Sequence, residues 1–295
     1  MDSLVHSFNF TADKAVRATY MWKTEVHKFL KNNQITFEIN QELSIFEILF
    51  LPDFQLYLHL IDLHKFSSSS VGTSYFQDLS EKVNLQNQRI IHLWEDVWID
   101  KKDLVQSRIL AMIGKFSRLN ARHCVIERID KPTADKFLND NHLQGSVKAK
   151  FKYGLFLKAQ YTEKFLGREN TDNELIAVAT FSGGRTLKEG EREGFRSFEL
   201  IRFASLKGFV VVGGMDKLLR AFIAEHSPDD IMSYADRDWS DGRSYLTLGF
   251  TKIGFLSPQT FVIDEISKQR RLSREDNYLL MNAGSIKFVK ILKQG

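Results

Sequence analysis

The sequence predicts a two-domain protein of the α/β (α+β) class, and three observations support this prediction. The chain has 295 residues, which is more than one average domain contains. Its composition, 43% apolar and 26% charged, leaves enough hydrophobic mass for two cores. Residues 198–250 read in order as strand, glycine turn, helix, strand, helix and strand. The boundary is expected near Gly114–Asn120, which divides the chain into domains 1–118 and 119–295.

The N-terminal half opens with a predicted amphipathic helix over Thr11–Asn32, whose apolar residues recur at helical spacing. Three apolar-rich runs follow, with Pro52-Asp53 as a turn between the last two, which predicts a meander of strands. These runs are residues 35–37, 43–51 and 54–63. After a serine-rich loop that begins at Ser67, the predicted elements are a helix over 75–85, a buried strand over 89–94 and a periodic helix over 101–113.

In the C-terminal half, a strand is predicted over 124–129 and a helix over 134–141, with Thr133 as its N-cap. An alternating strand over 148–157 is expected to place Lys148, Lys150 and Lys152 on one face and to pair antiparallel with 174–181. The remaining predicted elements are strands 198–203, 230–235 and 251–255, helices 215–225 and 243–248, and a hairpin that joins 279–281 to 286–289 through Asn282-Ala283-Gly284-Ser285.

The composition also limits the class of protein. The single cysteine, Cys124, rules out a disulfide framework and fits a reducing cytoplasm. No apolar run approaches ~20 residues, so no membrane span is expected, and the first residues lack the layout of a signal peptide. The net charge is +4, and residues 121–295 hold the basic excess, with 28 Lys+Arg against 23 Asp+Glu. This balance permits nucleic-acid binding without requiring it.

A glycine pair stands where the helix over 215–225 is predicted to begin. Backbone N–H groups and the positive end of the helix dipole face outward at such a point and can hold a phosphate or pyrophosphate. Because glycine has no Cβ, the backbone can approach a ligand closely there. A tight turn without a ligand is the alternative interpretation of the same pair.

The ordered segments around this pair resemble the cofactor half of the GNAT acyltransferase superfamily: Phe198–Ser205, Val210–Met215, Ser233–Asp236 and Tyr245–Phe250. The Tyr-Ala-Asp strand is similar to a phage-associated branch that includes the Mom-like DNA adenine-modification proteins. The resemblance implies a GNAT-like mixed-sheet C-domain, two strands that diverge around the cofactor, and acetyl-CoA or a related acyl donor. The residues that it places against the cofactor are Phe209, Val210, Val211, Val212, Gly213, Gly214 and Lys217.

The resemblance also implies candidate catalytic residues. Tyr245 occupies the place of a tyrosine that often protonates the leaving thiolate in GNAT enzymes, and the loop around His142 is expected to wall the acceptor pocket. Asp236, at the carboxyl end of a strand, is a candidate base if burial raises its pKa; the alternative is a structural role, as a helix cap or in a salt bridge to Arg237 or Arg243.

Cationic side chains supply candidates for contact with DNA. Arg202 lies on a core strand and is expected either to pair with Asp236 or to bind a substrate phosphate. The residues that could contact a substrate or a nucleic-acid backbone are Arg202, Arg237, Lys148, Lys150, Lys152, Arg185, Arg192 and Arg196. A solvated charged face is the alternative for the lysines.

Residues 22–110 resemble the very-short-patch-repair-like branch of PD-(D/E)XK nucleases, through Leu51-Pro52 and the segment Arg89–Trp98 that precedes a helix with Ser107. The family pattern requires carboxylates at positions that Ile48 and His59 occupy here, and these residues suit Mg²⁺ poorly. The resemblance therefore implies a restriction-endonuclease-like N-domain that has lost cleavage, with no metal site. The alternative is a shifted metal site formed by Asp53, Asp62, His59 and His64. Glu95 and Asp96 are expected to cap the next helix.

These expectations combine into a phage or mobile-element protein, located in the host cytoplasm, that transfers an acyl-type group to a nucleic-acid base or another amine. DNA is the expected partner, and no membrane contact is expected. Two alternatives remain: a non-catalytic DNA-binding or assembly protein that retains both folds, and an acetyltransferase that acts on protein or a small molecule.

Overall fold

A computed structural model describes residues 21–264, 270–273 and 279–293. The chain divides into two units. Unit 1 comprises Met1–Lys102, Ala235–Asp241 and Phe255–Ile286, and unit 2 comprises Asp103–Tyr234, Gly242–Gly254 and Lys287–Gly295. This division differs from a single boundary after residue 118, because two C-terminal segments pack with the N-terminal sheet.

Unit 1 is built on a four-stranded sheet in the order β1-β2-β3-β4. The predicted meander is confirmed, because β1 (Glu38–Asn40), β2 (Glu47–Leu51) and β3 (Leu56–Ile61) pair antiparallel, although β1 follows the predicted run 35–37 instead of coinciding with it. β4 (Arg89–Trp94) pairs parallel with β3. Residues 21–32 form the described part of the first predicted helix, whose residues 11–20 lie outside the described chain.

Three helices follow the sheet strands of unit 1 along the chain. They are α2 (Leu63–Ser67), which was not predicted, α3 (Tyr75–Asn84) and α4 (Glu95–Met112). α4 begins earlier than predicted and has non-helical backbone angles at Lys101 (φ −128°, ψ 34°). The division between the units follows this irregular residue, since unit 2 starts at Asp103.

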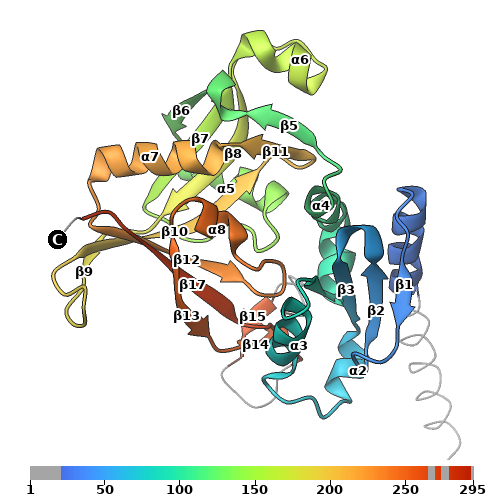
Figure 1. Cartoon of the computed structure of the whole chain (residues 1–295). Coiled ribbons are helices and arrows are strands. Elements are labelled where there is room, and N and C mark those ends of the chain that lie inside the picture. Colours follow the sequence, from blue (N-terminus) through green and yellow to red (C-terminus); the bar gives the residue numbers. More distant parts are fainter. Residues whose placement is uncertain (1–20, 265–269, 274–278, 294–295) are drawn as a thin grey trace, which may run out of the picture. The chain divides into compact units, whose positions relative to one another are not determined.

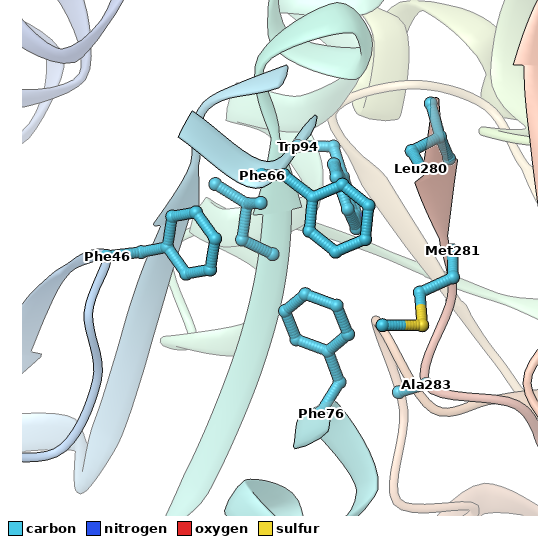
Figure 2. Packing of buried hydrophobic residues seen from close by; sticks show 8 residues of the cluster. Phe46, Phe66, Phe76, Trp94, Leu280, Met281 and Ala283 are labelled. Atoms are coloured by element: carbon cyan, nitrogen blue, oxygen red, sulfur yellow. The ribbon is translucent and has the colours of Figure 1, made fainter. Parts of the chain in front are cut away.

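The core of unit 1 explains why a C-terminal segment belongs to it. Aromatic side chains from the N-terminal part lie beside apolar side chains from residues 280–283 in one buried cluster (Figure 2). The buried members are Phe46, Ile61, Phe66, Phe76, Trp94, Leu280, Met281 and Ala283. Burying such side chains stabilises a fold by about 1.5–3 kcal/mol each. The hydrophobic core is therefore completed by residues that are distant in sequence.

The predicted hairpin over 279–289 is wrong. β16 (Leu280–Met281) pairs with β14 (Thr260–Ile263), which also pairs with β15 (Arg270–Leu272), whereas β17 (Ser285–Ile291) lies in the large sheet of unit 2. The physical reason lies at Asn282, whose side-chain oxygen accepts hydrogen bonds from the N–H groups of Gln259 and Gly284. The polar turn residues therefore hold β16 beside β14 instead of folding it onto β17.

Unit 2 contains a large mixed sheet in the order β13-β17-β12-β10-β8-β7-β6 (Figure 1). β6 (Cys124–Arg128), β7 (Phe151–Leu157), β8 (Glu174–Phe181) and β10 (Arg196–Ser205) pair antiparallel in turn, and β9 (Arg185–Thr186) pairs with β10. β12 (Asp230–Asp236) pairs parallel with β10, and β17 and β13 (Thr251–Leu256) complete the order. The predicted mixed α/β class is confirmed.

After the part of α4 that lies in unit 2, the described helices of this unit are α5 (Lys131–Asn141), α6 (Thr162–Leu166), α7 (Gly214–His226) and α8 (Arg243–Thr247). The N-cap of α5 is Asp130 rather than the predicted Thr133, because the Asp130 carboxylate accepts the Thr133 N–H at 2.9 Å. A two-stranded parallel sheet pairs β5 (Ser117–Asn120) with β11 (Phe209–Val212).

Candidate active site

The parallel ladder between β10 and β12 is short. Ser197–Glu199 pair with Asp230–Met232, and the pairing stops there although both strands continue. Beyond this point β10 pairs only along its other edge, with β8. The first contact past the ladder is made by a side chain, since the Ser233 hydroxyl lies 2.8 Å from the Leu200 carbonyl oxygen. The predicted separation of these two strands is confirmed.

A β-bulge in β10 decides which side chains meet at this point. Leu200 and Arg202 pair with consecutive residues of β8, so Ile201 is an extra residue without its own partner. Glu199 projects from the face opposite Leu200, because successive side chains alternate along a strand. The extra residue shifts this alternation, and Arg202 therefore shares a face with Glu199.

Arg202 continues a cross-strand row on this face. It lies opposite Thr180 on β8, and Thr180 lies opposite Lys152 on β7. Directly opposed residues of an antiparallel ladder project to the same face. The structure thus brings two predicted cationic residues, Arg202 and Lys152, onto the face that also carries Glu199.

Glu199 is a functional candidate that the sequence reasoning missed. It is half-buried at the end of the ladder, and burial raises the pKa of its carboxyl while the nearby Arg202 and Arg185 lower it. A carboxylate whose pKa is raised toward neutrality suits a general base. The available signal was a charged residue inside the apolar run Phe198–Ile201.

The opposite face of the sheet packs against α7. Phe222 of α7 stacks on Phe181 at 3.9 Å between ring centroids and meets Phe198 edge-on. Ile231 of β12, the partner of Phe198 in the parallel ladder, is fully buried. This aromatic packing fixes the helix beneath the strands that separate.

Tyr245 of α8 lies close to the end of the ladder. Its hydroxyl is 2.9 Å from the hydroxyl of Ser233. The Ser233 hydroxyl therefore lies within hydrogen-bond distance of both the Leu200 carbonyl oxygen and the Tyr245 hydroxyl. Burial raises the pKa of Tyr245, while the bond to Ser233 lowers it. The phenol therefore keeps its proton at neutral pH, as a proton donor must.

Packing holds the Tyr245 ring in place. The ring stacks on Phe288 of β17 at 5.1 Å and meets Phe250 edge-on at 5.5 Å. Gly242, the N-cap of α8, has φ +78°, and a Cβ there would lie 2.3 Å from the Phe288 ring. Only glycine fits at this position, because any side chain would collide with the Phe288 ring on which Tyr245 stacks.

The predicted cofactor segment takes a more regular form than a turn. Phe209, Val210, Val211 and Val212 form β11, and Gly213 follows with φ +73° as the N-cap of α7. A Cβ on Gly214 would lie 3.0 Å from the Val211 side chain, so glycine lets the start of α7 pack closely on β11. The exposed Gly213 and Val212 leave backbone at the helix start accessible to solvent.

Lys217 has a structural role in this segment. Its Nζ donates to the carbonyl oxygens of Ala121, at 2.9 Å, and Cys124, at 2.6 Å. These bonds tie the first turns of α7 to the start of β6. Ser107 of α4 adds a second tie, because its hydroxyl accepts the Gly208 N–H at 2.9 Å just before β11.

The loop after α5 joins the cationic row. His142 ends α5, and its Nδ1 accepts the Gln144 N–H at 3.2 Å. The carbonyl oxygen of Gly145 accepts from Nε of Arg202 at 3.3 Å. The structure therefore places the predicted loop next to Arg202.

Asp236 and Arg237 are assigned to unit 1. The Asp236 carboxylate accepts the Asp238 N–H at 3.0 Å, which caps the turn after β12. Arg237 is 7% exposed, and its guanidinium donates to Glu81 at 3.2 Å and lies over the ring of Phe255. These contacts give Arg237 a structural role within its unit.

The remaining predicted cations are dispersed. Lys148 and Lys150 are exposed and precede β7, so Lys152 is the member of the predicted lysine face that lies in the strand. Arg185 is exposed on β9 and approaches the sulfur of Met232 at 4.0 Å. Arg192 forms an ion pair with the buried Asp230 at 2.5 Å.

Unit 1 places the nuclease-like positions in its core. Ile48, His59 and His92 lie side by side on β2, β3 and β4, and all three are fully buried. Asp62, a member of the alternative metal site, is held by Trp22 and Lys23, and no group of His, Cys, Asp and Glu within the described residues is arranged to hold a metal.

Glu95 and Asp96 act differently from the prediction. Glu95 opens α4, but its carboxylate accepts the N–H of Leu63 at 3.0 Å and so caps α2. Burial raises the pKa of Glu95. Asp96 makes a two-point ion pair with Arg270 at 2.7 and 2.8 Å. Both acids therefore bind segments other than the helix that they begin.

Comparison with known proteins finds no match among families or curated sequences and low-scoring matches among solved structures. No protein-family model and no curated protein matches the chain. Among solved structures, an acetyltransferase from Bacillus subtilis in complex with CoA has a TM-score of 0.35 and 12% identity, over 58% of this chain and 99% of that chain. The ribosomal-protein-S18-alanine N-acetyltransferase from Escherichia coli has a TM-score of 0.35 and 11% identity, over 58% and 96%.

A third solved structure, of histone acetyltransferase HPA2 and related acetyltransferase from Corynebacterium glutamicum, has a TM-score of 0.36 and 12% identity, over 59% of this chain and 98% of that chain. Values this low identify no activity, substrate or partner. Within unit 2 itself, β12 pairs parallel with β10, and the ladder between them ends before α8 begins. Within the described residues, every helix is too short or too polar to span a lipid bilayer.

Proposed function

We propose that unit 2 transfers an acyl group from an acyl-CoA to an amine. The observation that supports this most directly is the end of the β10–β12 ladder, where Glu199 and Tyr245 each lie close to the point of separation. A base and an acid beside one opening are what transfer between two bound molecules requires.

The backbone of Val212–Gly214 and the first turn of α7 would hold the pyrophosphate of the donor. The exposed Gly213 puts no side chain in front of the amide groups, and the helix dipole favours an anion there. An acyl-CoA would supply the activated thioester carbonyl and a thiolate leaving group. Lys217 would act indirectly, since it anchors the helix through carbonyl oxygens.

Glu199 would accept the proton that the attacking amine loses, and Tyr245 would give its phenolic proton to the departing sulfur. The amine nitrogen forms the new bond to the carbonyl carbon as the bond from carbon to sulfur breaks. Asp236 is the other candidate base, but its carboxylate is already used to cap a turn. His142 would line the acceptor side, next to Arg202.

We also propose that the acceptor is a base of a nucleic acid, in line with the resemblance to the DNA-modification branch. The support is the pair of cations on the Glu199 face, Lys152 and Arg202, together with Arg185, which lies near enough to Glu199 to lower the pKa of its carboxyl. A base in duplex DNA would have to be flipped out to reach the site. Unit 1 would then grip DNA without metal-dependent cleavage, because Ile48 and His59 occupy the carboxylate positions.

The test is calorimetric binding of acetyl-CoA, followed by transfer assays that measure free CoA thiol and by mass spectrometry of nucleosides from treated DNA. Binding and a new nucleoside are expected. Tyr245→Phe and Glu199→Gln should each lower kcat by about 10²–10⁴-fold while CoA binding persists. Absence of CoA binding would refute the transferase proposal, and DNA retention without turnover would favour a non-catalytic DNA-binding protein.

A further inference from the structure

Thr180 stands out among the buried polar residues of unit 2. It is 1% exposed, and within the described part of the chain its hydroxyl has no hydrogen-bond partner. A buried hydroxyl without a partner destabilises the folded protein, so its retention calls for a partner that the chain itself does not supply. Its position in the middle of the cross-strand row indicates what that partner is.

The two neighbours of Thr180 in this row are cations. Lys152 on β7 and Arg202 on β10 lie directly opposite Thr180, and both are half-buried. Arg202 is oriented by the carbonyl oxygens of Gly145 and Ile201, and the Lys152 ammonium lies 3.5 Å from the Lys150 carbonyl oxygen, with no ion pair to a carboxylate among the described residues. An ammonium, a hydroxyl and a guanidinium in one row form a donor set for an anion.

We propose that the row Lys152–Thr180–Arg202 binds an oxyanion, a phosphate or a carboxylate, that is part of the acceptor molecule. This rests on the proposed function of unit 2, because it makes the face that carries Glu199 the acceptor side. The anion would anchor the acceptor on the sheet, and its amine would then be directed to the Glu199 carboxylate. Neutral amines and polyamines would lack this anchor.

The first test measures anion binding without knowing the acceptor. The melting temperature of the full chain is recorded in inorganic phosphate, in succinate and in chloride at matched ionic strength. At about ten times its dissociation constant, the preferred anion should raise the melting temperature by about 3 °C. Lys152→Gln and Arg202→Gln should remove the rise, whereas Lys136→Gln on the exposed surface of α5 should keep it.

The outcomes are separable. Stabilisation by phosphate identifies a phosphorylated acceptor, and stabilisation by succinate identifies a carboxylated one. No excess over chloride, or an excess that survives both row variants, overturns the oxyanion site. Calorimetry with acetyl-CoA tests the donor side independently, so loss of CoA binding counts against the transferase proposal and not against the row.

A second variant tests the role of the hydroxyl itself. Thr180→Val keeps the shape of the side chain but removes its oxygen. Without added anion, the variant should melt at the same temperature as the wild type or higher, because no internal hydrogen bond is lost. Its affinity for the stabilising anion should fall by about tenfold or more, since hydrogen bonds to charged groups are strong. A lower melting temperature without anion would show that Thr180 has a partner inside the protein, and would refute the proposal.

Discussion

The buried histidine pair of unit 1 should make that unit sensitive to acid. His59 and His92 are fully buried, and their Nδ1 atoms lie 2.9 Å apart. Burial lowers the pKa of His92 from 6.5 to about 3, with a further contribution from Arg237. Burial, His92 and Lys23 hold the pKa of His59 well below its usual value. Both imidazoles are therefore neutral in the folded protein.

Hydrogen bonding fixes the protons of this pair. The Ser80 hydroxyl donates to the Phe76 carbonyl, so its oxygen accepts from Nε2 of His92 at 2.8 Å. A neutral imidazole has one N–H, hence Nδ1 of His92 accepts from Nδ1 of His59. Nε2 of His59 then accepts from the Ser44 hydroxyl at 2.7 Å. A second proton on His92 would set two N–H groups against each other.

The loss of unfolding free energy in acid follows from the difference between the histidine pKa values of the folded and unfolded chain. Because the folded pKa is depressed, the unfolded chain binds more protons as the pH falls below 6.5, and stability is lost in that direction. At pH 5, about 1.5 units below the unfolded value, His92 should cost about 2 kcal/mol of unfolding free energy. With an equal contribution from His59, the pair should cost up to about 4 kcal/mol.

Urea unfolding followed by tryptophan fluorescence would measure this loss, because all four tryptophans lie in unit 1. The control is the double variant His59→Gln and His92→Gln, which keeps hydrogen-bonding groups but cannot be protonated. The wild type should lose more stability than this variant between about pH 7 and pH 5. Buried carboxyls such as Asp238, whose pKa is raised, act in the opposite sense and cancel in the difference. Equal losses in both proteins would refute the reasoning.

Three further predictions follow from the packing and the site. Met281→Ala should destabilise unit 1 by about 2–5 kcal/mol in urea unfolding, because the side chain completes its core, and a fragment ending at residue 118 should unfold for the same reason. Cooperative urea unfolding of the fragment that ends at residue 118 would contradict this prediction. Gly213→Ala should strain the αL backbone by about 1–2 kcal/mol and weaken acetyl-CoA binding in calorimetry, whereas Gly190→Ala in an open loop should leave CoA binding unchanged. Transfer activity should rise with pH through the raised pKa of Glu199, and Glu199→Gln should abolish that rise in a pH–rate profile, while Asp236→Asn keeps it.

Local patterns predicted most strands and helices of unit 2 to within a few residues. The β8 prediction matches its observed bounds, and the helix predicted over 215–225 is α7. These elements have strong periodicity and clear glycine boundaries, which are properties of the local sequence. The division into units was not predictable in this way, because Leu280 and Met281 contact aromatic residues that are some 200 positions earlier in the chain.

The site was predicted in outline and revised in detail. The separated strands and Tyr245 follow from the order of segments, whereas the nuclease resemblance of the N-terminal half stays a prediction. Asp236 looked like a base because it ends a strand, yet its carboxylate caps a turn. Arg237 looked available, yet it is buried against Glu81. Such partners depend on tertiary contacts that residue type alone does not encode.

The bulge at Ile201 shows why strand periodicity failed at the most informative point. A regular strand would place Arg202 two residues after Leu200 and thus on the same face, against the rings of Phe181 and Phe222. Burying a guanidinium there without a partner would cost several kcal/mol. The extra residue turns Arg202 to the other face, beside Glu199 and Thr180. The one extra residue therefore moves a charged side chain out of the apolar core and onto a polar face. The acceptor side of the proposed reaction depends on this change of face.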